Sequence, residues 1–474
     1  MIHVLGILFD ILTFLVLIYF LLVNGFYLFF IILSFFGISR YRHRTEYIRM
    51  EEIFLSPLAK PISIIAPAYN EENSIVESVG NLLSLEYPQY EVIVVNDGSK
   101  DSTLKRLIDA FGLKKTQWVF RKVADHKPVR GIYVSPANPK LIVVDKVNGR
   151  KADAMNAGLN IAHYPLFCAI DSDCLVDRDS LLKVVRPFLE DPERTVGVGG
   201  IIRLVNGCSV KSGQVTRIRL PRNILASFQI LEYFRAFLGG RIGMSLIKSL
   251  LIISGAFGVF RKDVVLKCGG YRPASIGEDL DLVVRLRKYL HDHKTPYAIH
   301  FLPDPICWTE VPETLRSLGR QRNRWHRGLI ESFIYNRRMI FNPHYGVTGL
   351  FAMPFYLFFE LLGPLIELAG YVIFAICLFF GLVNYPFALT FFLLSVALGT
   401  LLSIAALLLE EFSLRRFPRV SDVLLMAVYC ILENILYRQY LAFVRCKAFF
   451  DYLHGKKDWG TMEKKGFTEE VPCP

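Results

Sequence analysis

The chain has 474 residues, 53% of them hydrophobic, and a net charge of +12; its mean hydropathy is +0.36. This length exceeds what one compact unit usually holds, and the hydropathy lies between that of a soluble protein and that of a chain buried wholly in a membrane. We therefore expect one globular domain with a few membrane spans. The nine scattered cysteines include no C-x-x-C pair, which argues against a disulfide framework or a zinc site and favours a reducing compartment.

The positive charge is gathered beside the apolar runs. Arg40, Arg42 and Arg44 follow the first run, Arg337 and Arg338 precede the second, and Arg415, Arg416 and Arg419 follow the third. Basic residues at the ends of spans are typical of the cytoplasmic side of a membrane, where anionic headgroups attract them. We therefore expect membrane lipids as partners, and no nucleic acid.

The first apolar run, residues 4–38, is almost uncharged beyond Asp10. About 20 helical residues cross a bilayer core, so this run is long enough to span it with tilt. It lacks a basic n-region and a small-residue cleavage site, so we do not expect a removed signal peptide. Because arginines follow it, the helix should run from outside to inside. This predicts a multi-pass protein of the cell membrane with its globular domain in the cytoplasm.

The elements after this helix predict a parallel sheet. Residues 62–66 and 90–95 are apolar runs of the kind buried in such sheets, and helical segments at 74–85 and 102–111 follow them. This alternation indicates βαβ units and a doubly wound α/β sheet. Ligands of such sheets bind beyond the carboxyl ends of the strands, so the polar segments that end these two strands should face one crevice.

The same alternation continues to about residue 302, where the last strand is expected. The expected elements are short strands at 131–134 and 141–144, a helix opening at 149–158, a strand at 164–170, a basic hairpin at 198–220, a helix at 226–238 that could lie on the membrane surface, an apolar segment at 252–260, a helix at 279–290 and a strand at 299–302.

Beyond residue 345 the chain has the composition of a membrane region. Residues 346–382 are apolar but contain Glu360 and Glu367, which should face a bundle interior or a wet pathway, or else lie at the interface. Residues 386–409 form a clean span, and residues 423–444 fit an interfacial or re-entrant helix as well as a span. The expected units are a transmembrane helix at 1–40, a cytoplasmic domain at 41–325, an interfacial helix and linker at 326–345, transmembrane and interfacial helices at 346–446, and a basic tail at 447–474.

Two carboxylates, Asp171 and Asp173, follow the strand at 164–170. A pair of carboxylates beside a diphosphate suits a hard divalent cation. The alternative is a turn in which Asp and Ser satisfy backbone groups. The position after a buried strand, in the expected crevice, favours the metal.

Each of three further polar motifs allows two interpretations. Asp97 could accept a hydrogen bond from a base or a ribose hydroxyl, or belong to an Asn-Asp-Gly turn. Lys151, after Arg150, could meet phosphates where a helix opens, or lie on a solvated face. Glu278 and Asp279 could be acids favoured at a helix start, or Asp279 could take a proton from an attacking hydroxyl.

A basic and aromatic stretch at residues 318–327 lies between the part of the chain with an α/β pattern and the part with the composition of a membrane region. Gln321, Arg324 and Trp325 fall at i, i+3 and i+4, on one face of a helical turn. This face could look into the crevice as a polar and aromatic platform. The interleaved Arg320, Arg322 and Arg327 should face anionic headgroups.

Together these motifs resemble the membrane-embedded family 2 glycosyltransferases, the group of processive synthases of cellulose, hyaluronan, chitin and poly-N-acetylglucosamine. The resemblance covers about residues 61–325 with the flanking spans, and the motifs occur in the family's order. It implies a GT-A-like doubly wound mixed sheet combined with a helical transmembrane region. One departure is Gly277-Glu278-Asp279, where the family has Thr-Glu-Asp; both acids remain.

The resemblance also implies roles for individual residues. The implied donor-binding residues are Tyr69, Asn70, Glu72, Asp97, Lys151, Asp171 and Arg324, with Asp97 on the uracil. Asp171 and Asp173 would hold Mg²⁺ or Mn²⁺, Asp279 would be the catalytic base beside Glu278, and Gln321 and Trp325 would bind the acceptor. Trp459, Gly460 and Thr461 resemble a segment that closes over the site.

The implied activity is inverting, processive transfer from a UDP-sugar, with UDP-GlcNAc or UDP-glucose favoured. The product would be a β-linked polysaccharide, and its synthesis would be coupled to membrane translocation. Two alternatives stay open: transfer of one sugar to a lipid acceptor, and a nucleotide-sugar-binding membrane module without catalysis. Such synthases often need an accessory membrane or envelope export subunit, which is therefore a candidate partner.

Overall fold

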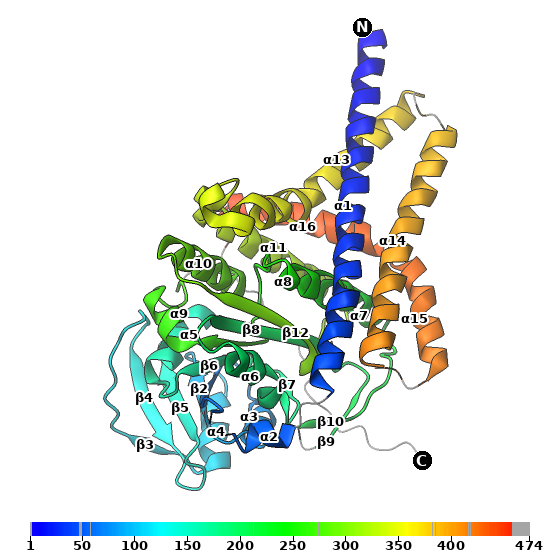
Figure 1. Cartoon of the computed structure of the whole chain (residues 1–474). Coiled ribbons are helices and arrows are strands. Elements are labelled where there is room, and N and C mark those ends of the chain that lie inside the picture. Colours follow the sequence, from blue (N-terminus) through cyan, green and yellow to red (C-terminus); the bar gives the residue numbers. More distant parts are fainter. Residues whose placement is uncertain are drawn as a thin grey trace.

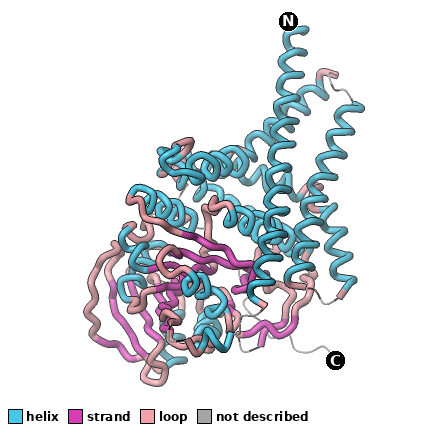
Figure 2. Tube along the Cα trace, in the orientation of Figure 1, coloured by secondary structure: helices cyan, strands magenta, loops and turns pink. Residues whose placement is uncertain are grey.

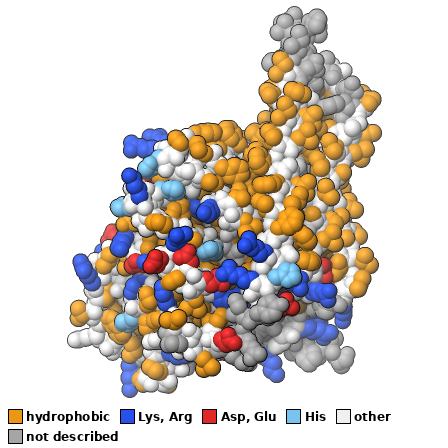
Figure 3. Space-filling model, viewed as in Figure 1, with side chains coloured by type: hydrophobic (Ala, Val, Ile, Leu, Met, Phe, Trp, Pro, Cys, Tyr) orange, Lys and Arg blue, Asp and Glu red, His pale blue; other side chains and the backbone are white. Residues whose placement is uncertain are grey.

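The computed structural model describes residues 2–46, 50–56, 58–211, 213–273, 275–381, 383, 385–415, 417 and 419–456. An α/β domain lies below a group of long helices, and α1 (Ile2–Thr45) runs along this group (Figure 1). Apolar side chains cover the long helices, whereas charged side chains gather over the α/β domain (Figure 3). This division is the one that the composition predicts.

The α/β domain is built on a ten-stranded sheet, ordered β3-β4-β5-β2-β1-β6-β11-β8-β12-β7. The strands are drawn in magenta in Figure 2. The strands β5, β2, β1 and β6 are parallel, while β11 pairs antiparallel with both β6 and β8. Their bounds are β1 Ile62–Ala68, β2 Tyr90–Asn96, β3 Lys114–Thr116, β4 Val129–Val134, β5 Leu141–Lys146, β6 Leu166–Ile170, β7 Leu175–Val176, β8 Thr195–Leu204, β11 Phe257–Arg261 and β12 Ala298–Thr309. The expected mixed, doubly wound sheet is confirmed.

The central strands form the core because they are buried almost throughout. The helices of the domain are α2 Met50–Phe54, α3 Ile75–Leu83, α4 Thr103–Phe111, α5 Lys151–Ile161, α6 Ser180–Glu190, α9 Lys262–Lys267, α10 Glu278–Asp292 and α11 Leu315–Tyr335. Helix α5 packs on β1 and β2. A Cβ added at Gly158 would lie 2.4 Å from the Ile65 side chain, so glycine permits this close contact.

The prediction of a hairpin over residues 198–220 is wrong for its first part. Residues 195–204 form β8, a wholly buried strand between β11 and β12. Glycines hide its apolar character in the sequence, and they are needed because a Cβ at Gly200 would meet the Ile306 side chain. The hairpin is limited to β9 Ser209–Lys211 and β10 Gln214–Arg217.

The helix expected at 226–238 is an internal element. It consists of α7 Ile224–Tyr233, the π-helix η1 Phe234–Arg241 and α8 Ile242–Leu246. Residues 226–231 are buried, and this segment contacts α1, α14 and α15. It therefore joins the α/β domain to the long helices, and does not lie on a free surface.

Among the residues that the structure describes, three helices are long and apolar enough to cross a membrane: Ile11–Thr45, Thr348–Phe379 and Ala388–Ser413. A fourth candidate is the pair α15 Val420–Leu432 and α16 Tyr437–Leu453, bent by 56° as in a broken span or a re-entrant loop. The remaining elements are η2 Arg337–Met339, η3 Pro343–Tyr345, η4 Thr348–Ala352, α12 Met353–Phe355, η5 Tyr356–Leu361, α13 Gly363–Phe379 and α14 Tyr385–Ser413. Glu360 accepts a hydrogen bond from Tyr27 of α1, so it faces a neighbouring helix.

Candidate active site

A pocket lies at the carboxyl ends of the parallel strands, between α5 and α10. It is lined by Lys151, Met155, Ala169, Ile253, Ser254, Gly255, Phe260, Tyr271, Glu278, Asp279 and Leu282. Asp171 lies beside it, because its carboxylate is bound to Lys151. The pocket brings together acids from two motifs far apart in the sequence, but the residues that line it do not include the polar segments after β1 and β2 that were expected to face one crevice.

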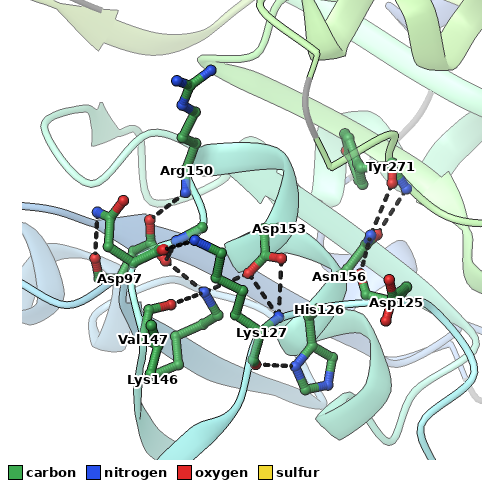
Figure 4. A network of polar contacts seen from close by, with 12 residues as sticks. Asp97, Asp125, His126, Lys127, Lys146, Val147, Arg150, Asp153, Asn156 and Tyr271 are labelled. Atoms are coloured by element: carbon green, nitrogen blue, oxygen red, sulfur yellow. Dashed lines mark hydrogen bonds and ion pairs between the residues drawn. The ribbon is translucent and has the colours of Figure 1, made fainter. Parts of the chain in front are cut away.

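Asp97, directly after β2, is 3% exposed, and both of its carboxylate oxygens accept hydrogen bonds. Its Oδ1 accepts hydrogen bonds from Lys146 Nζ at 2.6 Å and from the Gly149 amide at 2.9 Å. Its Oδ2 accepts one from the Arg150 amide at 2.7 Å (Figure 4). Asp97 thus connects the end of β2 to the two residues that precede α5.

Lys146, the last residue of β5, is completely buried and bridges two carboxylates. Its ammonium lies 2.6 Å from Asp97 Oδ1 and 2.5 Å from Asp153 Oδ1 (Figure 4). Asp153 also accepts the backbone amide of Lys127. Sequence reasoning missed Lys146 and Asp153. The available signal was a lysine closing an apolar strand, which can be buried only if it is paired.

Lys151, the first residue of α5, holds the acids of the pocket together. Its Nζ lies 2.5 Å from Asp171 Oδ1 and 3.0 Å from Glu278 Oε1. Burial alone lowers the pKa of Lys151, but the carboxylates of Asp171 and Glu278 outweigh this effect and raise it well above its ordinary value. A permanent positive charge therefore stands where a diphosphate would meet the helix start.

Asp279 lies in the first turn of α10 and is held by two backbone amides. Gly255 N–H donates to its Oδ2 at 3.1 Å, and Leu280 N–H donates to its Oδ1 at 2.8 Å. The carbonyl of Gly255 accepts Lys151 Nζ at 3.2 Å. One residue of the loop before β11 therefore positions both Asp279 and Lys151 in the pocket.

Asp171 and Asp173 form the candidate metal centre. Ligand atoms of these two residues and of Cys174 lie within 4.8 Å of one another. A hydrogen bond from Cys307 lowers the pKa of Cys174, but burial and the neighbouring acids raise it overall. A neutral thiol is a poor ligand for a hard cation, so the two carboxylates are the residues that fit Mg²⁺ or Mn²⁺.

The polar residues after β1 fasten their loop to α4. Asn70 Oδ1 accepts the Lys100 amide at 2.8 Å, and Glu72 Oε2 accepts the Ser102 amide at 3.0 Å. Tyr69 is 44% exposed. The structure therefore gives Asn70 and Glu72 a role in loop geometry, and it leaves the Tyr69 ring accessible.

The predicted platform lies on α11. Gln321 is 8% exposed and Trp325 is 44% exposed. Among the described residues, no hydrogen bond reaches Gln321 Oε1. Arg324 is partly buried and interacts with at least one other group of the chain. A buried, unsatisfied amide oxygen beside an accessible indole ring offers an acceptor for a hydroxyl and a stacking surface for a ring.

The prediction that the interleaved arginines face lipid headgroups is wrong for two of them. Arg322 is 1% exposed; it donates to Glu232 Oε2 at 2.8 Å and lies 4.1 Å from the Trp325 ring centroid. Arg327 is 5% exposed and donates to Asn323 and to the Lys456 carbonyl. Both are buried because α7 and α16 pack against α11, which helical periodicity does not reveal.

Residues 59–328 match the model of the family described as "Glycosyltransferase like family 2", which covers more than half of the chain. The chain belongs to this family. Two similar curated proteins are the poly-beta-1,6-N-acetyl-D-glucosamine synthases of Staphylococcus epidermidis (strain ATCC 35984) and Staphylococcus aureus (strain MSSA476). Both are 30% identical, over 270 and 271 residues, which are 56% of this chain and 54% of each relative. The chain thus aligns with about half the length of these relatives.

One solved structure shares the fold of this family 2 glycosyltransferase. The mannosyltransferase PcManGT from Pyrobaculum calidifontis, in complex with GDP-Man and Mn²⁺, aligns with a TM-score of 0.51 at 18% identity. The alignment covers 92% of this chain and 99% of that one. It confirms the GT-A-like mixed sheet with several long apolar helices.

The structure explains the glycine of the glycosyltransferase's Gly277-Glu278-Asp279 motif. A Cβ at Gly277 would lie 3.0 Å from the backbone of Gly328, and one at Gly328 would lie 2.8 Å from Gly277. Glu331 Oε2 accepts the Ile276 amide at 2.9 Å beside this contact. Two glycines therefore let α11 approach the start of α10, with Trp325 less than one turn before Gly328.

The predicted gating residues Trp459, Gly460 and Thr461 lie outside the described residues.

Proposed function

We propose that the chain is an inverting, processive glycosyltransferase that polymerises UDP-GlcNAc into a β-linked polysaccharide, with UDP-glucose as the next donor to test. The observation that carries this proposal is the pocket in which Lys151 joins Asp171 to Glu278 beside Asp279. It collects, in one place, the groups needed for a diphosphate and for a proton acceptor. The similarity to poly-beta-1,6-N-acetyl-D-glucosamine synthases supports the choice of donor.

Donor binding would use the carboxyl ends of β2 and β6. Asp97 Oδ2 accepts a hydrogen bond from the Arg150 amide and would accept a second one from the uracil N–H. Lys151 and Arg324 would meet the diphosphate. Asp171 and Asp173 would hold Mg²⁺ or Mn²⁺, which supplies positive charge to the leaving phosphates. The cation in the structurally similar mannosyltransferase supports testing Mn²⁺ first.

Transfer would proceed by one displacement at the anomeric carbon. The acceptor sugar stacks on Trp325, with a hydroxyl bonded to Gln321 Oε1. Asp279 takes the proton of the attacking hydroxyl as the new C–O bond forms on the opposite face from the diphosphate. The old bond to the phosphate oxygen breaks, and UDP leaves with the electron pair. An α-linked donor thus yields a β-linkage.

Attachment to the cell membrane, with the catalytic domain in the cytoplasm, completes the proposal. Three or four helices long and apolar enough to span support it, as do the arginines that follow α1. Helices beside the site would then provide a route for the product across the bilayer.

The test is UDP release and product length for the purified full-length protein with UDP-GlcNAc, UDP-glucose and UDP-glucuronate, each with Mn²⁺ or Mg²⁺. The proposal expects a long polymer with one donor, and much reduced release with Asp279→Asn. One sugar on a lipid would support the non-processive alternative. Absence of UDP release with every donor and acceptor would leave a binding module and reject catalysis.

A further inference from the structure

A groove that shares no residue with the catalytic pocket lies between the apolar helix α13 and the C-terminal half of α16. It is lined by Leu368 of α13 and, from α16 and the residues after it, by Phe443, Cys446, Lys447, Phe450, Asp451, His454 and Lys456. Its volume of about 500 Å³ lies in the range of ligand sites. The groove accompanies a helix, Thr348–Phe379, that is long and apolar enough to cross a bilayer.

The two parts of the groove differ in chemistry. Phe443 and Phe450 are 60% and 62% exposed, and their spacing of seven residues places them on one face of α16. The exposed cation Lys447 lies between these two rings along α16, and the exposed cation Lys456 lies past the end of the helix, at the polar end of the groove. Apolar rings with ammonium groups beside them and beyond them are complementary to a molecule with an acyl tail and an anionic head.

The acid in the groove does not oppose an anionic occupant, because its charge is already compensated. Asp451 Oδ1 accepts Lys456 Nζ at 2.7 Å, and its Oδ2 accepts Asn323 Nδ2 at 2.9 Å. Within the described ranges, Lys447 forms no hydrogen bond or ion pair. One cation of the rim is therefore available to a headgroup while Asp451 stays paired.

The polar end of the groove is bonded to the helix that carries the platform. Asn323 and Arg327 of α11 contact Asp451 and the Lys456 carbonyl, respectively. Tyr440 of α16 donates to the Leu315 carbonyl at 2.5 Å. An occupant held by Lys447 and Lys456 would therefore brace the end of α16 against α11.

We propose that this groove binds an anionic phospholipid of the surrounding bilayer, with its acyl chain along Phe443 and Phe450 and its headgroup phosphate at Lys447 and Lys456. This site is independent of the proposed sugar transfer, because its residues lie outside the catalytic pocket. Its consequence is that the bilayer's anionic lipid stabilises the α11–α16 contact.

The experiment counts retained lipid by native mass spectrometry. The full-length protein is placed in nanodiscs of phosphatidylcholine with a minor fraction of phosphatidylglycerol. We expect the wild-type protein to retain phosphatidylglycerol selectively. In the double variant Lys447→Gln with Lys456→Gln, retention should fall roughly fivefold for each lysine lost. Arginine at both positions should restore retention. The matched control replaces two exposed lysines of β3, Lys114 and Lys115, by Gln, and should retain the lipid.

Three results would overturn the site. The first is equal retention by the Gln variant and the β3 control, at equal thermal stability. The second is unchanged retention after Phe443→Ala with Phe450→Ala, since the apolar wall would then contribute nothing. The third is retention that appears only after removal of residues 457–474, since the groove would then belong to that segment of the chain.

Discussion

The buried ammonium group of Lys146 lies 2.6 Å from Asp97 Oδ1 and 2.5 Å from Asp153 Oδ1. One strand end thereby joins the carboxylate that follows β2 to the first turn of α5. The same helix begins with Lys151, which contacts Asp171 and Glu278. The position of Asp97 and the assembly of the pocket acids therefore depend on the start of α5 and on two lysines, Lys146 at the end of β5 and Lys151 at the start of α5.

Replacing Lys146 by Met should weaken nucleotide binding and destabilise the fold. Breaking a buried ion pair from one side costs about 3–5 kcal/mol, because Asp97 and Asp153 would keep uncompensated charge. We expect a lower melting temperature and a KM for the UDP-sugar raised more than kcat is lowered. Lys146→Arg should recover part of the effect, and Lys105→Met, at an exposed position of α4, serves as control. Unchanged UDP affinity in calorimetry, with a folded variant, would contradict the positioning role.

Asp279→Asn should lower kcat roughly 10²–10⁴-fold, the usual contribution of a general base. The amide keeps the size of the side chain. UDP binding should change little, because the Asp279 carboxylate is linked to the predicted donor-binding residues only indirectly, through Gly255. Calorimetric UDP affinity and steady-state turnover measure the two effects separately. A variant that turns over at the wild-type rate would exclude Asp279 as the base.

Removal of divalent cations should abolish turnover, and Mn²⁺ or Mg²⁺ should restore it. Asp171 and Asp173 provide hard oxygen ligands, so Asp173→Ala should raise the Mn²⁺ concentration needed for half-maximal activity. The control is Asp179→Ala, whose carboxylate pairs with Lys183 beyond the pocket. Full activity in the presence of excess chelator would reject the metal centre.

Gly277→Thr should separate α10 from α11. The new Cβ would lie 3.0 Å from the Gly328 backbone, and overpacking of this kind costs about 1–3 kcal/mol. We expect a lower melting temperature and reduced activity, because Asp279 and Trp325 lie on opposite sides of the contact. Gly80→Ala in α3, where a Cβ meets nothing within 4 Å, should be neutral or stabilising. Equal melting temperatures for the two variants would show that α10 and α11 can move apart without loss of stability.

His326 predicts a loss of stability in acid. Burial, aided by the positive charge of Arg445, lowers the pKa of His326 to about 3. Its folded pKa lies below the unfolded value, so neutral His326 favours the native state above about pH 6.5. This stability is lost as the pH falls from there toward 3, by at most ~1.4 kcal/mol per pH unit. In the His326→Phe variant, the melting temperature should depend less on pH over this range. An unchanged dependence on pH would contradict the role given to His326.

Much of the fold followed from local pattern. The apolar runs of β1, β2 and β6 and those of the three span-length helices are continuous in sequence, so burial alone predicts them. The position of Asp97 and Asp171 after such strands also follows, because the carboxyl ends of parallel strands meet at one edge. The placement of these two acids at strand ends was therefore predictable without knowledge of any long-range contact.

Only the tertiary structure decided which charges are buried and which surfaces meet. Arg322 looks like a headgroup anchor in the sequence, yet Glu232, 90 residues away, makes it a buried partner. Lys146 looks like the end of a strand, yet it compensates two acids. The glycines of β8 and the pair Gly277–Gly328 look like flexible positions, yet neighbouring backbone and side chains leave no room for a Cβ. Each of these outcomes depends on the distance between residues that are remote in the chain, which periodicity and composition do not encode.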